Sequence, residues 1–145
     1  MPTSTNTKTD AIQRMIELGT RHALLEGRCD LEGVMATLSD DPVYEFYPLR
    51  QRMRGRETVR RYYEHLMAEF IPRASSVLVQ AWGNETSVAQ EYDITITVDG
   101  AEERHRVLGI LVGDGQLLTG ERVYGSERAI RLMLGPIYEL LEPIA

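Results

Sequence analysis

The sequence predicts an α+β domain in which helices near the start of the chain pack against a curved, mostly antiparallel sheet. Helical periodicity dominates the first half of the chain, whereas residues 74–125 are β-rich and interrupted by turn dipeptides. At 145 residues, the chain is long enough for one domain to bury a substantial core. We expect residues 10–145 to form this domain, after a disordered polar tail over residues 1–9.

Four segments are expected to be helical. Residues 10–27 carry an apolar stripe and end at Gly27, and residues 56–70 place apolar side chains on one face. Shorter helices are expected over residues 31–38 and 127–134. Together they supply enough apolar surface to cover one face of a sheet.

The β-rich half contains three dipeptides that favour tight turns: Gly83-Asn84, Asp99-Gly100 and Asp114-Gly115. Such pairs adopt the positive φ angles that two-residue hairpin loops require. They separate four runs, near residues 74–82, 85–98, 101–113 and 116–125, and so predict a four-stranded antiparallel meander. An earlier strand, "VYEFYP", ends at Pro48.

Composition excludes several classes of function. The net charge of −6 argues against a nucleic-acid partner, and no apolar run approaches the ~20 residues of a membrane helix. The single cysteine, Cys29, excludes an intramolecular disulfide, so we expect a cytoplasmic protein. The arginine-rich segment 50–61 is interpreted as the solvated face of an edge strand rather than a phosphate site.

Two carboxylates, Glu91 and Asp93, lie two residues apart and therefore share one face of their strand. If every hairpin has a two-residue loop, Asp93 lies opposite Arg106, and Leu108 lies opposite both Glu91 and Glu121. These side chains then share one face of the sheet. The other face carries Tyr92, Ile94, Ile96, His105, Val107, Leu111, Leu118, Arg122 and Tyr124.

Which face lines a cavity decides what these acids do. Carboxylates held close together in an apolar cavity cannot all ionise easily, so the pKa of at least one is raised. A carboxyl group with a raised pKa is suited to general acid–base catalysis. On the solvent side, the same residues form an ion-pair ladder, and the larger number of apolar residues on the other face favours that alternative.

The order of elements resembles the nuclear transport factor 2-like superfamily, especially its SnoaL-like polyketide cyclase branch. The phrases "DDPVYEFYP", "RGRETVRRYYEHL" and "GDGQLLTGERVY" carry the resemblance, which spans residues 10–134. It implies a cone-shaped, cystatin-like α+β domain with a cavity for a small apolar organic ligand, and a homodimer. It fixes the fold more firmly than the function, because one fold hosts many chemistries.

The catalytic residues of the family are only partly present. Its isomerases place an Asp just before a proline at the end of the first strand, where this chain has Tyr47. Its epoxide hydrolases use an Arg-x-Asp on a central strand, which resembles Glu91-Tyr92-Asp93 with only Asp93 retained. Their terminal Asp falls on Gly125. The resemblance therefore favours the face of Asp93 as the cavity wall.

We therefore predict Asp93 and Glu91 as catalytic carboxylates of the cavity. The predicted substrate-binding residues are Arg106, Glu121, Tyr47, Tyr62 and Tyr63. No cofactor is expected, and no metal, because His22, His65 and His105 lie on separate elements.

Two functions remain open at this point. One is a cofactor-independent isomerase, cyclase, dehydratase or epoxide hydrolase that acts on a small apolar substrate. The other is a binding or dimerisation module with the same fold and no chemistry.

Overall fold

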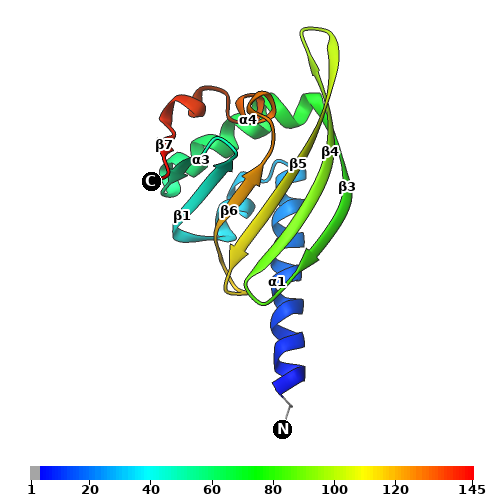
Figure 1. Ribbon diagram of the computed structural model, residues 1–145, viewed down its shortest axis with the longest axis vertical. Helices are drawn as coiled ribbons and strands as arrows, with labels where there is room; N and C mark the ends of the chain where they lie inside the picture. Colours follow the sequence, from blue (N-terminus) through cyan, green and yellow to red (C-terminus); the bar gives the residue numbers. More distant parts are fainter. Residues whose placement is uncertain (1–3) are drawn as a thin grey trace.

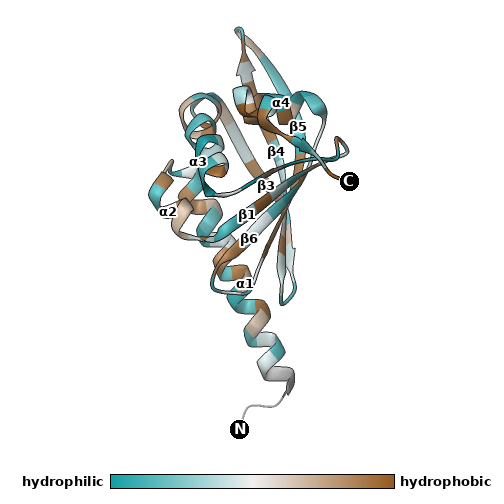
Figure 2. Cartoon of the chain, turned by 90° about the vertical axis from the view of Figure 1, so that its left-hand side faces the viewer, coloured by the Kyte–Doolittle hydropathy of each residue, from teal (hydrophilic) through white to brown (hydrophobic). Residues whose placement is uncertain are grey.

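A seven-stranded sheet forms the framework of the computed structural model, which describes residues 4–145 (Figure 1). The strands are β1 (Leu38–Tyr47), β2 (Gln51–Arg54), β3 (Ala74–Gly83), β4 (Ser87–Val98), β5 (Ala101–Gly113), β6 (Leu118–Tyr124) and β7 (Glu142–Pro143). Their order across the sheet is β3-β4-β5-β6-β1-β2-β7, and only β1 and β6 are parallel neighbours. Helices gather on one side of this sheet (Figure 2).

The helices are α1 (Ser4–Gly27), α2 (Leu31–Ala36), α3 (Arg56–His65) and α4 (Glu127–Leu134). A π-helical turn (Leu66–Phe70) and a 3₁₀ turn (Ile71–Arg73) continue α3, and a second 3₁₀ segment (Gly135–Leu140) follows α4. The four expected helices are thus present, with shifted ends. Within the described residues, no helix is long and apolar enough to cross a membrane.

The N-terminal segment differs from the expected disordered tail. Residues 4–9 form the first turns of α1, which extends past the sheet (Figure 1), and residues 1–3 lie outside the described residues. Residues 4–9 contain neither proline nor glycine, so a helix nucleated over residues 10–27 can propagate backwards through them.

The predicted meander is confirmed as β3–β4–β5–β6. The Asp99-Gly100 loop has two residues, both with positive φ, and it pairs Val98 with Ala101 as expected. The Gly83-Asn84 turn is longer, because β3 ends at Gly83 and β4 begins at Ser87. This difference does not change the register between β4 and β5.

The hairpin at Asp114-Gly115 differs in a way that matters for the site. The Asp114 carboxylate accepts hydrogen bonds of 2.8 Å from the backbone N–H groups of Gln116 and Leu117, which stabilises a four-residue loop. Gly113 consequently pairs with Leu118, a shift of two residues that alone would keep the expected face. A β-bulge follows, because the next pair is Val112 with Gly120 and Thr119 is left as an extra residue. The bulge makes the total shift odd, so Leu111 pairs with Glu121 and β6 is turned over relative to the expected register.

The core lies between the helices and the sheet face that carries Ile94, Ile96, Val107 and Leu111, all of which are buried. Tyr44, Phe46 and Leu118 extend it across β1 and β6. The face with the larger number of apolar residues is therefore the interior. Close packing of β1 against β6 requires Gly120, since any Cβ there would collide with the backbone carbonyl of Val43.

The arginine-rich segment is structural. We expected an edge strand here, but β2 is not at the edge of the sheet, because the short C-terminal strand β7 pairs with it. Glu142 on β7 accepts from Arg52 at 2.9 Å and lies 3.0 Å from Arg54. Arg56 donates to three backbone carbonyls at the end of α2 and the start of β1. These arginines thus connect segments of the chain through hydrogen bonds and ion pairs.

Candidate functional site

A cavity of about 330 Å³ lies between the helices and the inner face of the sheet. Most of its wall is apolar, supplied by Leu66, Phe70, Ile94, Val107, Leu111 and Met133. Its polar side chains include His22 and Glu26 from α1, Tyr62 from α3, Gln90 and Tyr92 from β4, and Glu121 from β6. A small, mainly apolar pocket with a few polar groups is the usual form of a ligand site.

Glu121 faces this cavity because the β-bulge at Thr119 pairs it with the inward-facing Leu111. Its carboxylate lies over Gly109, where an added methyl group would collide with Oε1 of Glu121. Among the described residues it has no hydrogen-bond or ion-pair partner. Burial, and to a lesser extent the charge of Glu26, raises the pKa of Glu121 to about 8.

Glu26 is the second carboxylate of the cavity. Its side chain is 29% exposed and lines the cavity, and burial raises its pKa to about 7. The nearest ring nitrogen, Nε2 of His22, lies 3.9 Å away, which is too long for a hydrogen bond. Burial lowers the pKa of His22 to about 4, so the imidazole is neutral at pH 7 and gives Glu26 no cationic partner.

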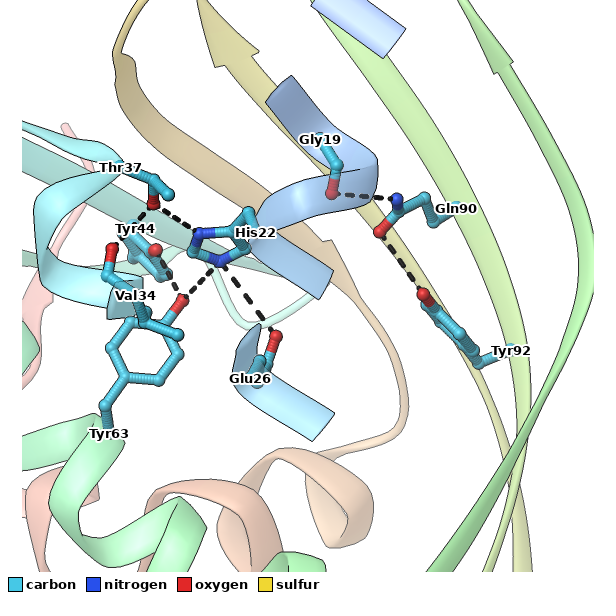
Figure 3. A network of polar contacts seen from close by, with 9 residues as sticks. All are labelled: Gly19, His22, Glu26, Val34, Thr37, Tyr44, Tyr63, Gln90 and Tyr92. Atoms are coloured by element: carbon cyan, nitrogen blue, oxygen red, sulfur yellow. Dashed lines mark hydrogen bonds and ion pairs between the residues drawn. The ribbon is translucent and has the colours of Figure 1, made fainter. Parts of the chain in front are cut away.

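A polar network behind the cavity fixes the tautomer of His22 (Figure 3). Thr37 Oγ1 donates to the carbonyl of Val34 at 2.6 Å, so it accepts from Nδ1–H of His22 at 2.7 Å. Nε2 then accepts from the Tyr63 hydroxyl at 3.0 Å, and Tyr63 accepts from the Tyr44 hydroxyl at 2.6 Å. The network is satisfied with a neutral imidazole, and it forms a fixed wall beside Glu26.

The predicted catalytic pair, Glu91 and Asp93, lies on the opposite face of the sheet. Arg106 donates from Nε to Asp93 Oδ1 at 2.8 Å and from Nη1 to Glu91 Oε2 at 2.7 Å. The expected pairing of Asp93 with Arg106 is confirmed, but the expectation that this face lines the cavity is wrong. The apolar residues that alternate with these acids face inward and leave the acids outside.

The other predicted binding residues divide between the two faces. Glu121 and Tyr62 line the cavity, whereas Arg106 does not. Tyr47 lies on the outer face, stacked on Tyr124 with ring centroids 5.2 Å apart, and donates to Glu45. Tyr63 is buried in the network behind the wall. For Arg106, Tyr47 and Tyr63, direct contact with a ligand in the cavity is therefore not supported.

Sequence reasoning missed the contribution of α1. His22 and Glu26 are four residues apart and continue the line of Met15 and Gly19 along the helix. Polar residues that extend an apolar stripe are the signal that could have placed them against the cavity. Among residues 4–145, no three His, Cys, Asp or Glu side chains are placed to hold a metal ion.

Fold and site together define a class of protein. Helices packed on a mostly antiparallel open sheet, with a cavity between the two layers, are the architecture of the nuclear transport factor 2-like α+β proteins. Residues 20–118 match the model of the SnoaL-like domain, and the chain belongs to this family. A comparison with curated proteins finds no significant match.

Several solved structures share the fold at low sequence identity. A protein from Kribbella flavida, described as a ketosteroid isomerase, is 20% identical with a TM-score of 0.66, and 80% of each chain is covered. An LEH-like epoxide hydrolase from M. tuberculosis is 18% identical with a TM-score of 0.66, over 88% of this chain and 94% of that one. An NTF2-like protein of unknown function from Cytophaga hutchinsonii is 16% identical, also at 0.66, over 77% and 99%.

Proposed function

We propose that this protein is a cofactor-independent enzyme that moves protons on a small, mainly apolar substrate, with Glu121 and Glu26 as its acid and base. The observation that supports this proposal is the placement of two carboxyl groups in one cavity, with no cationic partner among the described residues. Isomerisation, cyclisation, dehydration and epoxide hydrolysis are the reaction types that such a pair serves. None of the outer-face acids is needed.

The raised pKa values assign the roles. Because the two carboxyl groups interact, they titrate as a pair with apparent values near 7 and 8. Between these values the pair holds one proton, which the more basic Glu121 carries. Protonated Glu121 donates to an oxygen of the substrate, and ionised Glu26 accepts a proton from carbon or from an attacking water. In an isomerisation, Glu26 then returns its proton to another carbon of the substrate, and Glu121 takes one back from the oxygen. In epoxide hydrolysis the product keeps the proton from Glu121, and the pair is regenerated when the proton that Glu26 took from water passes to Glu121.

Two probe reactions test the proposal, and both require a proton to be moved by a general acid or base. We expect the protein to accelerate hydration of cyclohexene oxide or deuterium exchange at the α-carbons of cyclohexanone, both followed by NMR. Glu121→Gln should reduce the accelerated reaction by about 100-fold or more. Glu91→Gln, the same substitution on the outer face, should leave it unchanged. Equal rates in Glu121→Gln and the unmodified protein would refute the acid–base role.

The alternative is a binding module that uses the same cavity without chemistry. Tyr47 in the position of the isomerases' proton-shuttling Asp favours it, as does the largely apolar wall. A protein that binds both probes saturably, yet accelerates neither reaction, would support this alternative and contradict the enzyme.

We also propose a homodimer formed through the outer face of the sheet. Val77 is exposed on the neighbouring edge strand β3, and the stacked Tyr47 and Tyr124 lie on the outer face itself. Aromatic residues are enriched at such interfaces. Sedimentation equilibrium should give a dimer for the unmodified protein and a monomer for Tyr124→Asp. A monomeric unmodified protein would contradict it.

A cytoplasmic location stays a proposal as well. The thiol of Cys29 is free and exposed, which suits a reducing compartment. Thiol labelling of intact cells and of lysates distinguishes the locations, since only a protected cytoplasmic thiol requires lysis to react with an impermeant reagent.

A further inference from the structure

A second hollow lies beside the cavity, as a groove of about 320 Å³ along the edge strand β3 and the helix α1. Its apolar lining residues include Ile16, Leu24, Leu78, Ala81, Trp82 and Val88. Leu24, Leu78 and Trp82 are 54%, 50% and 48% exposed. Large apolar side chains gathered at this exposure mark a surface that binds an apolar group.

The groove and the cavity share one wall, because Ala23, Gln90 and Tyr92 line both. Gln90 donates to the carbonyl of Gly19, and the Tyr92 hydroxyl donates to Gln90, each at 3.4 Å (Figure 3). Both hydrogen bonds are longer than the usual range, so they are weak and rotation of either side chain loses little. The barrier between the two hollows is therefore made of side chains that only weak hydrogen bonds hold in place.

We infer that the groove is a second subsite of the same site, which holds the aliphatic tail of a substrate whose reacting group lies beside Glu121 and Glu26. Continuity supports this occupant, since a chain passing Gln90 and Tyr92 leads from one hollow into the other. Polarity supports it too. None of the groove's described lining residues is charged, whereas the cavity holds two carboxyl groups.

The inference names a substrate class: molecules with an oxygen function at one end and an uncharged chain at the other. It rests on the proposed function only for the position of the reacting group. Binding of the tail depends on apolar burial alone, so it can be measured without any turnover.

The test titrates a series of 2-alkanones, from about six to about fourteen carbons, into the protein by calorimetry. Each methylene that enters an apolar subsite should tighten the Kd about four-fold. In the unmodified protein we expect this tightening to continue along the series. In the double variant Leu24→Gln/Leu78→Gln, short members should bind as before, and the tightening should stop once the inner cavity is filled.

Leu140→Gln is the matched control, because Leu140 is also an exposed leucine, at 46%, and lines neither hollow. It should bind every alkanone like the unmodified protein. An unchanged slope in the double variant would overturn the inference, and so would equal weakening of short and long members. Absence of binding by the long members would overturn it too, whatever reaction the carboxyl groups perform.

A second copy of the chain is the competing occupant of the groove. In that case sedimentation would show a dimer that dissociates in the double variant, and the unmodified protein would show no dependence of Kd on chain length. That combination would overturn the subsite. Failure of the proton-transfer proposal is detected separately, by the rate of Glu121→Gln, which this titration does not measure.

Discussion

The two faces of the sheet carry carboxylates in opposite settings. On the outer face, Asp93 and Glu91 both accept hydrogen bonds from Arg106, whose side chain is 52% exposed. The hydrogen bond from Arg106 holds the pKa of Asp93 below its ordinary value. On the inner side, Glu121 and Glu26 have no cationic partner within residues 4–145, and burial raises the pKa of both.

This contrast shows that the partner and the solvent, rather than the residue type, decide what a carboxyl group can do. An acid that is already stabilised as an anion by arginine and water gives up its proton well below neutral pH and does not take it back. An acid in an apolar cavity holds a proton near neutral pH and can transfer it. Only Glu121 and Glu26 lie in such a cavity.

The largest predicted effect is the difference in pKa between the carboxyl groups on the inner and outer sides of the sheet. Carboxyl carbon NMR should show Glu121 titrating near pH 8 and Asp93 below its ordinary 3.8, at least about four pH units apart. Glu26→Gln should lower the pKa of Glu121, because the charge of Glu26 contributes to raising it. Titration of Glu121 below pH 5 would remove the contrast and the proposed acid.

The next prediction concerns the space that Glu121 occupies. Gly109→Ala places a methyl group where the carboxylate now lies, so the carboxylate must move. Displacing a catalytic group by about 1 Å costs up to about 100-fold in rate, and we expect a loss of about 10- to 100-fold in the probe reaction. Gly125→Ala is the control, since its added Cβ meets neighbours only at ordinary contact distances of 3.5 Å and beyond. An unchanged rate in Gly109→Ala would show that the position of Glu121 is unimportant.

A smaller effect is expected on stability as a function of pH. Folded Glu121 keeps its proton up to about pH 8, whereas the unfolded chain releases it near the ordinary 4.5. Between these values the folded state binds more protons, so this group lowers the free energy of unfolding as pH rises. Glu121→Gln should therefore gain stability over the unmodified protein between pH 5 and pH 8, by about 4 °C or more in Tm.

Asp93→Asn should change the stability in the opposite direction, and the same Tm measurement tests it. The pKa of Asp93 is lowered by folding, so its contribution is present above its ordinary value and is lost as the pH falls through the folded value. Asp93→Asn should therefore be less stable than the unmodified protein at pH 5 and at pH 8 alike. A gain that grows with pH in this variant would contradict the assignment of Asp93 to the outer face.

Local signals in the sequence were sufficient to predict most of the sheet. The Asp99-Gly100 pair fixes a two-residue loop, and period-two alternation fixes the strands on each side, so the pairing of Asp93 with Arg106 follows from counting. The apolar residues of β4 also indicated the inner face. The family resemblance instead favoured the face of Asp93, because it matched one residue and could not show where that residue pointed.

The inner carboxylates could not be placed by the same counting. Glu121 reaches the cavity because a β-bulge at Thr119 follows the four-residue loop that the Asp114 carboxylate caps. The Asp114-Gly115 dipeptide indicates a turn, but it shows neither the length of the loop nor a bulge after it. Glu26 reaches it from α1, which packs against strands distant in sequence. Helical periodicity shows which side of α1 is buried, but it does not show which part of that side borders a cavity.

The smallest predicted effect comes from breaking the outer ladder. Arg106→Ala removes the shared donor of Asp93 and Glu91, but exposed ion pairs contribute little, so Tm should fall by no more than about 2 °C. Salt should abolish most of that difference, because mobile ions screen exposed charges. The pKa of Asp93 should rise towards its ordinary value, while the pKa of Glu121 and the affinity for short alkanones stay unchanged. A change in the pKa of Glu121 would mean that the charges on the two faces interact through the sheet. The inner and outer carboxyl groups would then form one electrostatic system instead of two.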